Sequence, residues 1–142
     1  MLSEAAAAFV NRRRVAHLAT ADARGRPHAV PVCFTYLDGR FYIAIDEKPK
    51  QTVRLKRVRN IEENAQAALV FDHYDEDWSR LGWVMVQGKA AILEGGAEHA
   101  RALVALHEKY LQYETMALEG RPLISVTPER VSSWGLLGEA RP

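Results

Sequence analysis

The sequence predicts a mainly β fold with flanking helices, formed by one domain that spans residues 1–142. Most apolar stretches are short and have the character of strands, and turn residues separate them. Helical spacing recurs in only three segments. The length of 142 residues and a hydrophobic content of 48% suit one compact core, and no Ser- or Pro-rich linker divides the chain.

The first third of the chain contains one expected helix and three expected strands. The turn-forming sequence from Asp22 to Pro27 separates the first two strands, and Asp38-Gly39 predicts a tight hairpin before the third. The expected elements are a helix over residues 3–13 and strands over residues 15–20, 28–36 and 40–46.

The next segment predicts a helix over residues 52–63. Leu55, Val58 and Ile61 recur at helical spacing as its buried stripe. On such a helix, Lys50, Arg54 and Arg57 share one exposed face.

The second half of the chain alternates again between strands and one long helix. Helical spacing marks the longest helix through Ala100, Leu103, Val104, His107, Tyr110 and Leu111. The other expected elements are a strand over residues 67–71, an acidic loop over 72–80, a long strand over 83–93 that Gly95-Gly96 ends, and two closing strands over 123–126 and 131–134.

Positive charge is concentrated in one short stretch. The formal net charge of the chain is only +1, yet no acid interrupts this stretch before Glu62. A strand, a basic loop and the start of a helix suit phosphate binding, because free backbone N–H groups and the helix dipole add to the basic side chains. The stretch contains Lys48, Lys50, Arg54, Lys56, Arg57 and Arg59.

Several familiar kinds of site have no support in the sequence. No glycine-rich dinucleotide motif opens a helix, and no phosphate-binding lysine loop is present. The five histidines do not have metal-ligand spacing, and we interpret the carboxylates of residues 72–77 as a solvated loop rather than a cation site. Cys33 lies in an apolar run without the context of a catalytic nucleophile. We therefore expect no metal and no covalent catalysis.

Composition also limits the location and partners of the protein. A single cysteine excludes an intrachain disulfide, and the apolar runs are too short to span a membrane. The charges Arg12-Arg13-Arg14 follow the Ala-rich segment, whereas they precede the apolar segment of a signal peptide. We expect a cytoplasmic protein. The pI of 7.9 and the lack of aromatic residues within the basic stretch disfavour nucleic-acid binding.

The order of several motifs resembles that of the split-barrel flavoproteins, which include pyridoxamine 5'-phosphate oxidase and oxidoreductases that use the deazaflavin coenzyme F-420. The sequence of residues 72–78 is most similar to a deazaflavin-dependent subgroup. The motifs are Leu18–Thr20, Gly25–His28, His28–Phe34, Phe41-Tyr42 leading to Lys48–Lys50, Asn60–Val70, Gly82–Gly88 and Pro128–Trp134. The resemblance implies an FMN-binding split β-barrel that forms a homodimer.

The resemblance also implies roles for individual residues. Val30, Pro31, Val32 and Cys33 would lie against the cofactor ring, with the backbone of Ala44, Ile45 and Asp46 alongside. Lys48, Lys50 and Thr52, helped by Arg54 and Arg57, would hold the phosphate, in agreement with the charge argument. Trp83 and Trp134 would reach the ring from the second subunit, and Trp78 would cap the entrance. For each tryptophan, core or dimer packing is an equally open interpretation.

One departure from the oxidases bears on the activity. In pyridoxamine phosphate oxidases, an Arg-Leu-His type of segment after the final tryptophan grips the substrate, whereas here Gly135–Pro142 contains no histidine. Vitamin B6 oxidation is therefore disfavoured. The expected activity is hydride transfer between coenzyme F-420 and a small unsaturated or quinone-like substrate. FMN-dependent chemistry, and flavin or haem binding without catalysis, are the alternatives.

Overall fold

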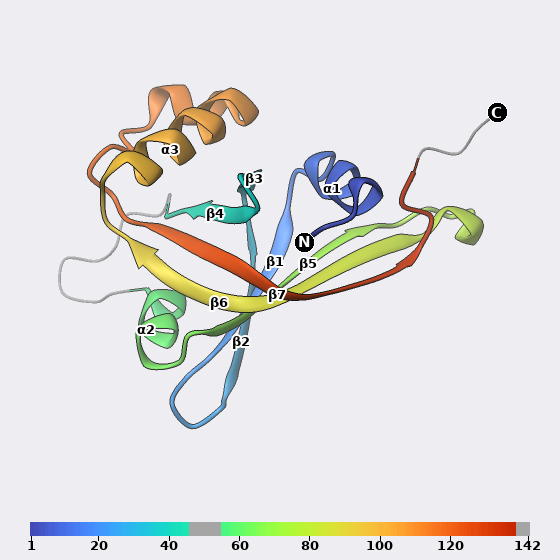
Figure 1. Ribbon diagram of the computed structural model, residues 1–142, viewed down its shortest axis with the longest axis horizontal. Helices are drawn as coiled ribbons and strands as arrows, with labels where there is room; N and C mark the ends of the chain where they lie inside the picture. Colours follow the sequence, from blue (N-terminus) through green and yellow to red (C-terminus); the bar gives the residue numbers. More distant parts are fainter. Residues whose placement is uncertain (46–54, 139–142) are drawn as a thin grey trace.

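The computed structural model describes residues 1–45 and 55–138, and within them the protein is built on one antiparallel sheet (Figure 1). The sheet has seven strands in the order β2-β1-β5-β6-β7-β4-β3. This mainly β architecture confirms the predicted fold class. The strands are β1 (Ala16–Ala21), β2 (Pro27–Val32), β3 (Phe34–Leu37), β4 (Arg40–Ala44), β5 (Gln66–His73), β6 (Gly82–Leu93) and β7 (Leu123–Gly135).

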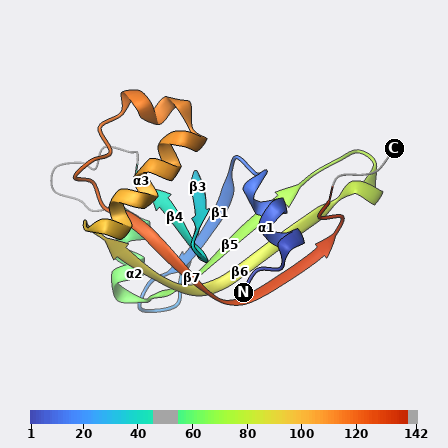
Figure 2. The ribbon, with the colours of Figure 1, turned by 45° about the horizontal axis from the view of Figure 1, so that its top comes forward.

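The connection between the two edge strands explains why the sheet is curled. β2 and β3 lie at opposite edges of the sheet, yet only Cys33 separates them in the chain. The sheet therefore has to bend until its edges approach each other, as in a barrel. The ribbon shows this strong curvature (Figure 2).

The interior of the curled sheet holds the main hydrophobic core. Phe34, Phe41 and Phe71 are fully buried there, with ring centroids of Phe34 and Phe71 4.9 Å apart. Helix α1 (Glu4–Asn11) contributes Phe9 and Val10 to this core. Its first turn is capped by the Ser3 hydroxyl, which accepts a hydrogen bond from the backbone of Ala6 at 3.1 Å.

A second, smaller core lies on the opposite face of β4. Tyr42 and Ala44 alternate with the inward residues of β4 and pack against helix α3 (Ala97–Lys109), which contributes Leu103 and Leu106. The 3-10 turn at Leu111–Thr115 follows α3. The structure thus has a helix on each side of the β3–β4 hairpin.

Helix α2 (Lys56–Glu63) begins later than predicted, because Leu55 is extended and serves as its N-cap. Val58 and Ile61 enter the main core, which confirms part of the predicted stripe. Arg57 is only 6% exposed, so its expected place on an exposed face is wrong. The helix packs against both β1 and β6, which encloses the turn that contains Arg57 and Asn60.

Three further expectations need correction. The predicted strand over residues 28–36 is two strands separated at Cys33. The two predicted closing strands are one continuous strand, β7. Pro128 lies between the two predicted strands and pairs with Gly88 at a bulge, where the loss of one N–H donor is tolerated. On α3, Val104 is 58% exposed and does not belong to a buried stripe.

No helix in the described part of the chain is long and apolar enough to cross a membrane. The loop over residues 72–80 is shorter than predicted, because β5 extends to His73 and a 3-10 turn forms at Trp78–Arg80. Within the described ranges, no three His, Cys, Asp or Glu residues come together as a possible metal site.

Candidate cofactor site

The predicted ring-binding strand points its side chains in two directions. Val30 and Val32 pair with Leu18 and Ala16, which are fully buried, and both valines contact the interior core. Pro31 pairs with His17 on the outer face of the sheet. Of these three side chains, a ring lying outside the sheet would meet only Pro31, together with the main chain of the edge strand.

Cys33 lies at the joint between β2 and β3 and is half-buried. Next to it, the backbone N–H of Phe34 donates to the Tyr110 hydroxyl oxygen at 3.1 Å, and that hydroxyl donates to the carbonyl of Arg14 at 2.9 Å. Burial raises the pKa of Tyr110 to about 12. Tyr110 therefore fixes this joint as a neutral donor throughout the physiological range.

Lys109 lies beside the same joint. Its Nζ is 3.6 Å from the centroid of the Phe34 ring and has no hydrogen-bond partner among the described residues. Burial, followed by the charge of Arg14, lowers the pKa of Lys109 to about 8. The cation is held against aromatic rings rather than paired with an acid.

The second predicted group lies at the end of β4. Ala44 and Ile45 are both buried, but Ala44 packs in the core under α3 and Ile45 in the core of the barrel. The chain then enters the predicted phosphate-binding segment. Asp46, Lys48, Lys50, Thr52 and Arg54 lie outside the described residues, so their predicted roles stay predictions.

The third group is formed by tryptophans on the outer face. Trp83 of β6 and Trp134 of β7 are direct register partners, so their side chains are neighbours. Trp134 is 53% exposed. Trp78 is 71% exposed and lies on the 3-10 turn before β6.

The register connects these tryptophans with Pro31. Pro31, His17, Val70, Met85 and Ser132 are paired in succession across five strands, and their side chains therefore share one face. Val70 and Met85 are partly buried on that face. We call Pro31, Val70, Trp83, Met85 and Trp134 the outer apolar face.

Within one subunit, Trp83 and Trp134 are far along the sheet from the end of β4. Trp83 lies at the start of β6, whereas Ala44 is joined through Leu123 to Leu93 at its end. Ten positions separate Trp83 from Leu93, which corresponds to about 33 Å along a strand. The two groups therefore lie at opposite ends of the β6–β7 ladder in one chain.

Acidic residues offset part of the basic stretch. The Asp22 carboxylate lies 2.7 Å from Arg26 Nε and 3.8 Å from Lys56 Nζ. Hydrogen bonds from the backbone and side chain of Arg26 lower the pKa of Asp22 to about 2. Within the described part of the stretch, Arg57 is buried and Lys56 is in an ion pair, so only Arg59 is exposed without a close acid in the described structure.

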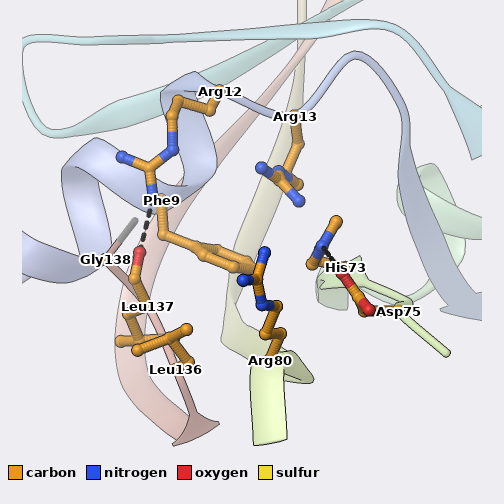
Figure 3. A pocket seen from close by; sticks show the side chains of 9 residues that line it. All are labelled: Phe9, Arg12, Arg13, His73, Asp75, Arg80, Leu136, Leu137 and Gly138. Atoms are coloured by element: carbon orange, nitrogen blue, oxygen red, sulfur yellow. Dashed lines mark hydrogen bonds and ion pairs between the residues drawn. The ribbon is translucent and has the colours of Figure 1, made fainter. Parts of the chain in front are cut away.

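A second group of basic residues was not predicted from the sequence. Arg12, Arg13 and Arg80 line a cavity of about 320 Å³ with His73 and Asp75 (Figure 3). The run Arg12-Arg13-Arg14 could have indicated this group, but the sequence interpretation used it only as evidence against a signal peptide. Arg80 is far from that run in the sequence, and only the curled sheet brings it there.

Comparison with known proteins identifies the family. The family model described as pyridoxamine 5'-phosphate oxidase matches residues 2–135. The chain is 26% identical over 132 residues to the 5a,11a-dehydrotetracycline/5a,11a-dehydrooxytetracycline reductase of Streptomyces rimosus, covering 92% of this chain and 81% of the reductase.

Two solved structures illustrate the shared fold. A FAD-binding protein from Mesorhizobium loti has a TM-score of 0.67 at 23% identity, covering 93% of this chain and 94% of that one. The haem storage protein HutZ from Vibrio cholerae has a TM-score of 0.70 at 18% identity, with 89% of each chain covered. The chain belongs to the pyridoxamine 5'-phosphate oxidase family, and its fold is the split barrel that the sequence predicted.

Proposed function

We propose that the protein is an oxidoreductase that binds coenzyme F-420 at the interface of a homodimer and transfers hydride between it and a small unsaturated or quinone-like substrate. Membership of the family and the similarity to a reductase support oxidoreductase chemistry. The similarity in fold to a FAD-binding protein supports a flavin-type ring. The choice of the deazaflavin is a further step that rests on the sequence of residues 72–78 and on the length of the basic stretch.

The observation that carries the proposal is the separation of the two halves of the site. The tryptophan pair and the end of β4 lie about 33 Å apart along the β6–β7 ladder. A second copy of the chain, packed through the outer apolar face, would bring the tryptophans of one subunit toward the basic stretch of the other. The exposed Trp134 is then an interface residue rather than an isolated apolar side chain.

The described residues fit a flat aromatic ring with an anionic tail. The edge strand β2 offers main-chain groups to the polar rim of a ring, and Pro31 and the tryptophans offer apolar contact. When bound, the cofactor supplies the hydride chemistry. The chain orients the cofactor ring, shields it from water with the outer apolar face, and supplies cationic groups for the anionic tail.

Titration with reduced coenzyme F-420 and, in parallel, with FMN tests the cofactor. Lys50→Ala and Arg54→Ala each remove one charge-assisted contact with phosphate, which costs about 1.5 to 3 kcal/mol or a tenfold or greater loss of affinity. Arg101→Ala is the matched control, because Arg101 is exposed on α3 and lies 4.0 Å from Asp38. Unchanged affinity in both test variants would contradict the placement of the phosphate.

Mixed dimers test whether two subunits share one site. Lys50→Ala and Trp134→Ala each damage a different half, so each variant alone is expected to bind weakly. If the halves come from different subunits, an equal mixture forms some dimers with one intact site, and about a quarter of all sites recover full affinity. No recovery after subunit exchange, with dimers confirmed by sedimentation, would place both halves in one subunit.

The alternatives have distinct optical signatures. The similarity in fold to HutZ keeps haem binding as the second candidate. Bound haem, FMN and deazaflavin differ in absorbance, so the spectrum of the purified and reconstituted protein separates them. Tight haem binding without affinity for either flavin-type cofactor would favour storage or sensing over hydride transfer.

A further inference from the structure

A cavity of about 320 Å³ lies between α1, the β5–β6 connection and the chain that follows β7. This volume is within the lower range of small-molecule sites. Figure 3 shows the side chains of Arg13 and Arg80 pointing toward each other across the cavity, with Arg12 at its edge. The remaining lining residues are Phe9, His73, Asp75, Leu136, Leu137 and Gly138.

Positive charge exceeds negative charge around this cavity. Three guanidinium groups face one carboxylate, that of Asp75. The Asp75 carboxylate already lies 3.7 Å from His73 Nε2, and Arg80 Nε lies 3.6 Å from Asp77. Within the described ranges, no carboxylate oxygen lies within 4.0 Å of Arg12 or Arg13. Arg80 is therefore paired with an acid, whereas Arg12 and Arg13 have no directly paired carboxylate, and Asp72 acts on Arg13 only from a longer distance.

The side chain of Arg13 is held in place, but one of its hydrogen-bond donors has no acceptor among the described residues. Its guanidinium lies over the Phe9 ring at 4.6 Å from the centroid, and its buried Nε has no hydrogen-bond partner among the described residues. Burial and the neighbouring charge of Arg12 lower the pKa of Arg13, and Asp72 only partly opposes this. A buried N–H donor of a charged group is costly unless an acceptor is present.

Arg12 holds the segment that forms one wall of the cavity, Leu136–Gly138, in place. An Arg12 amino group donates a hydrogen bond to the backbone carbonyl of Leu137. This contact fixes the chain after β7 against α1. It uses one donor of a group that has five, so Arg12 retains donors for a second acceptor.

We propose that this cavity is a binding site for a phosphate-type dianion, either free phosphate or the phosphate group of a small phosphate ester. Guanidinium groups bind phosphate through paired hydrogen bonds, and a dianion can accept from both Arg12 and Arg13, neither of which has a directly paired acid. A carboxylate has fewer acceptor oxygens and less negative charge to offer these two guanidinium groups. The apolar wall of Phe9, Leu136 and Leu137 leaves room for a small organic group beside the phosphate.

The site is separate from the basic stretch near α2. Figure 1 shows α1 and the start of β6 at one end of the sheet and α2 at the other. Arg13 and Arg80 do not belong to the proposed cofactor anchor. The inference does not depend on which cofactor the protein binds.

Titration of the full-length protein with inorganic phosphate, without any flavin, tests the site. The ring signals of His73 in the NMR spectrum are expected to shift with phosphate, because His73 lines the cavity, whereas those of His99 are not, because His99 is buried against the Arg121 carbonyl. Phenyl phosphate is expected to bind at least as well as phosphate, and acetate at least tenfold more weakly. Acetate binding as tightly as phosphate would overturn the assignment to a dianion.

Variants link the binding to the arginines. Arg13→Gln and Arg80→Gln are each expected to weaken phosphate binding tenfold or more, and Arg101→Gln is expected to leave it unchanged. Arg80 has a side chain that is 54% exposed, so Arg80→Gln keeps the test valid if Arg13→Gln fails to fold. Lys50→Ala separates this site from the cofactor anchor, because it is expected to leave the His73 response intact. Absence of a His73 response, or the same response in Arg80→Gln, would refute the site.

Discussion

The two ends of the β6–β7 ladder carry basic residues in different ways. At the α2 end, the basic residues are clustered within a dozen positions of the sequence, but Arg57 is buried and Lys56 approaches Asp22. At the other end, Arg80 comes from a distant part of the chain and joins Arg12 and Arg13 around a cavity. The basic side chains of α2 are thus partly buried or paired within the fold, whereas the cavity combines two adjacent arginines with one from a distant part of the chain.

The difference shows what decides whether a basic residue is available to a ligand. Asp22, a turn residue that is distant in the sequence, lies 3.8 Å from Lys56 and so offsets one charge of a stretch that contains no acid. A charge pattern therefore indicates a site only when the partners brought by the fold are known. The proposed cofactor anchor depends on Lys48, Lys50 and Arg54, and the proposed phosphate site depends on Arg13 and Arg80.

The largest effect is expected when one end of the ladder is damaged and the other is left intact. Gly135 has φ +83°, and a Cβ added there would lie well under 3.0 Å from the carbonyl oxygen of Leu81. Gly135→Ala is therefore expected to lower the free energy of unfolding by about 3 kcal/mol. Urea unfolding measures this loss.

The matched control is Gly95→Ala. Gly95 has no positive φ, and nothing lies within 4 Å of an added Cβ, so a change below about 0.5 kcal/mol is expected. The phosphate response of His73 should weaken in Gly135→Ala, because residues 136–138 form a wall of the cavity. Equal stability of the two variants would show that the close approach of Leu81 and Gly135 is not required.

The next effect concerns ligands rather than stability. Lys50→Ala is expected to reduce affinity for the flavin-type cofactor tenfold or more and to leave phosphate binding at the arginine cavity unchanged. Arg80→Gln is expected to do the reverse. Calorimetry with each ligand on both variants measures the two affinities. If either variant weakens both ligands equally, the two ends do not form independent sites.

The sequence predicted the fold class and most of the strands because the outward and inward residues alternate clearly. The joint at Cys33 and the continuity of β7 were not predicted. A strand that passes from one edge of a sheet to the other, as the chain does at Cys33, has the same local pattern as one long strand. Pro128 is a breaking signal that a bulge opposite Gly88 overrides.

The candidate site was predictable only in part. The resemblance placed Trp83 and Trp134 together, and their direct pairing agrees with that. It also grouped Val30, Pro31 and Val32, whose side chains the register divides between two faces of the sheet. The burial of Arg57 and the position of Arg80 depend on contacts between distant segments, which no local pattern encodes.

A smaller effect tests how Asp22 offsets charge at the α2 end. Asp22 is buried, and hydrogen bonds hold its pKa at about 2 rather than the usual 3.8. A lowered carboxyl pKa adds stability that is present above pH 3.8 and is lost as the pH falls toward 2. Asp22→Asn is therefore expected to lower the melting temperature by a few degrees at pH 7.

The pH dependence distinguishes the carboxylate from packing. The difference in melting temperature between wild type and Asp22→Asn should shrink as the pH falls below 4. Glu119→Gln serves as the control, because Glu119 is an exposed acid in the described structure. A difference that stays constant down to pH 2.5 would assign the loss to side-chain shape rather than to charge.

The smallest expected effect involves Lys109, a cation that belongs to neither end. Its Nζ is enclosed by the rings of Phe34 and Tyr110 rather than by a cavity or an acid. Its pKa is about 8 in the folded protein and 10.5 in an exposed lysine. Between these values the unfolded chain binds more protons, so the stability of the wild type rises with pH.

Relative to Lys109→Met, the wild type should gain about 1 kcal/mol between pH 7 and pH 10, after allowance for solvent screening of the partly exposed side chain. Urea unfolding of both proteins across this range measures the difference, in which the titration of all other groups cancels. Lys89→Met is the control, because Lys89 is exposed. If the wild type gains as much stability relative to Lys89→Met as relative to Lys109→Met, burial of Lys109 at the β2–β3 joint is not the cause of the gain.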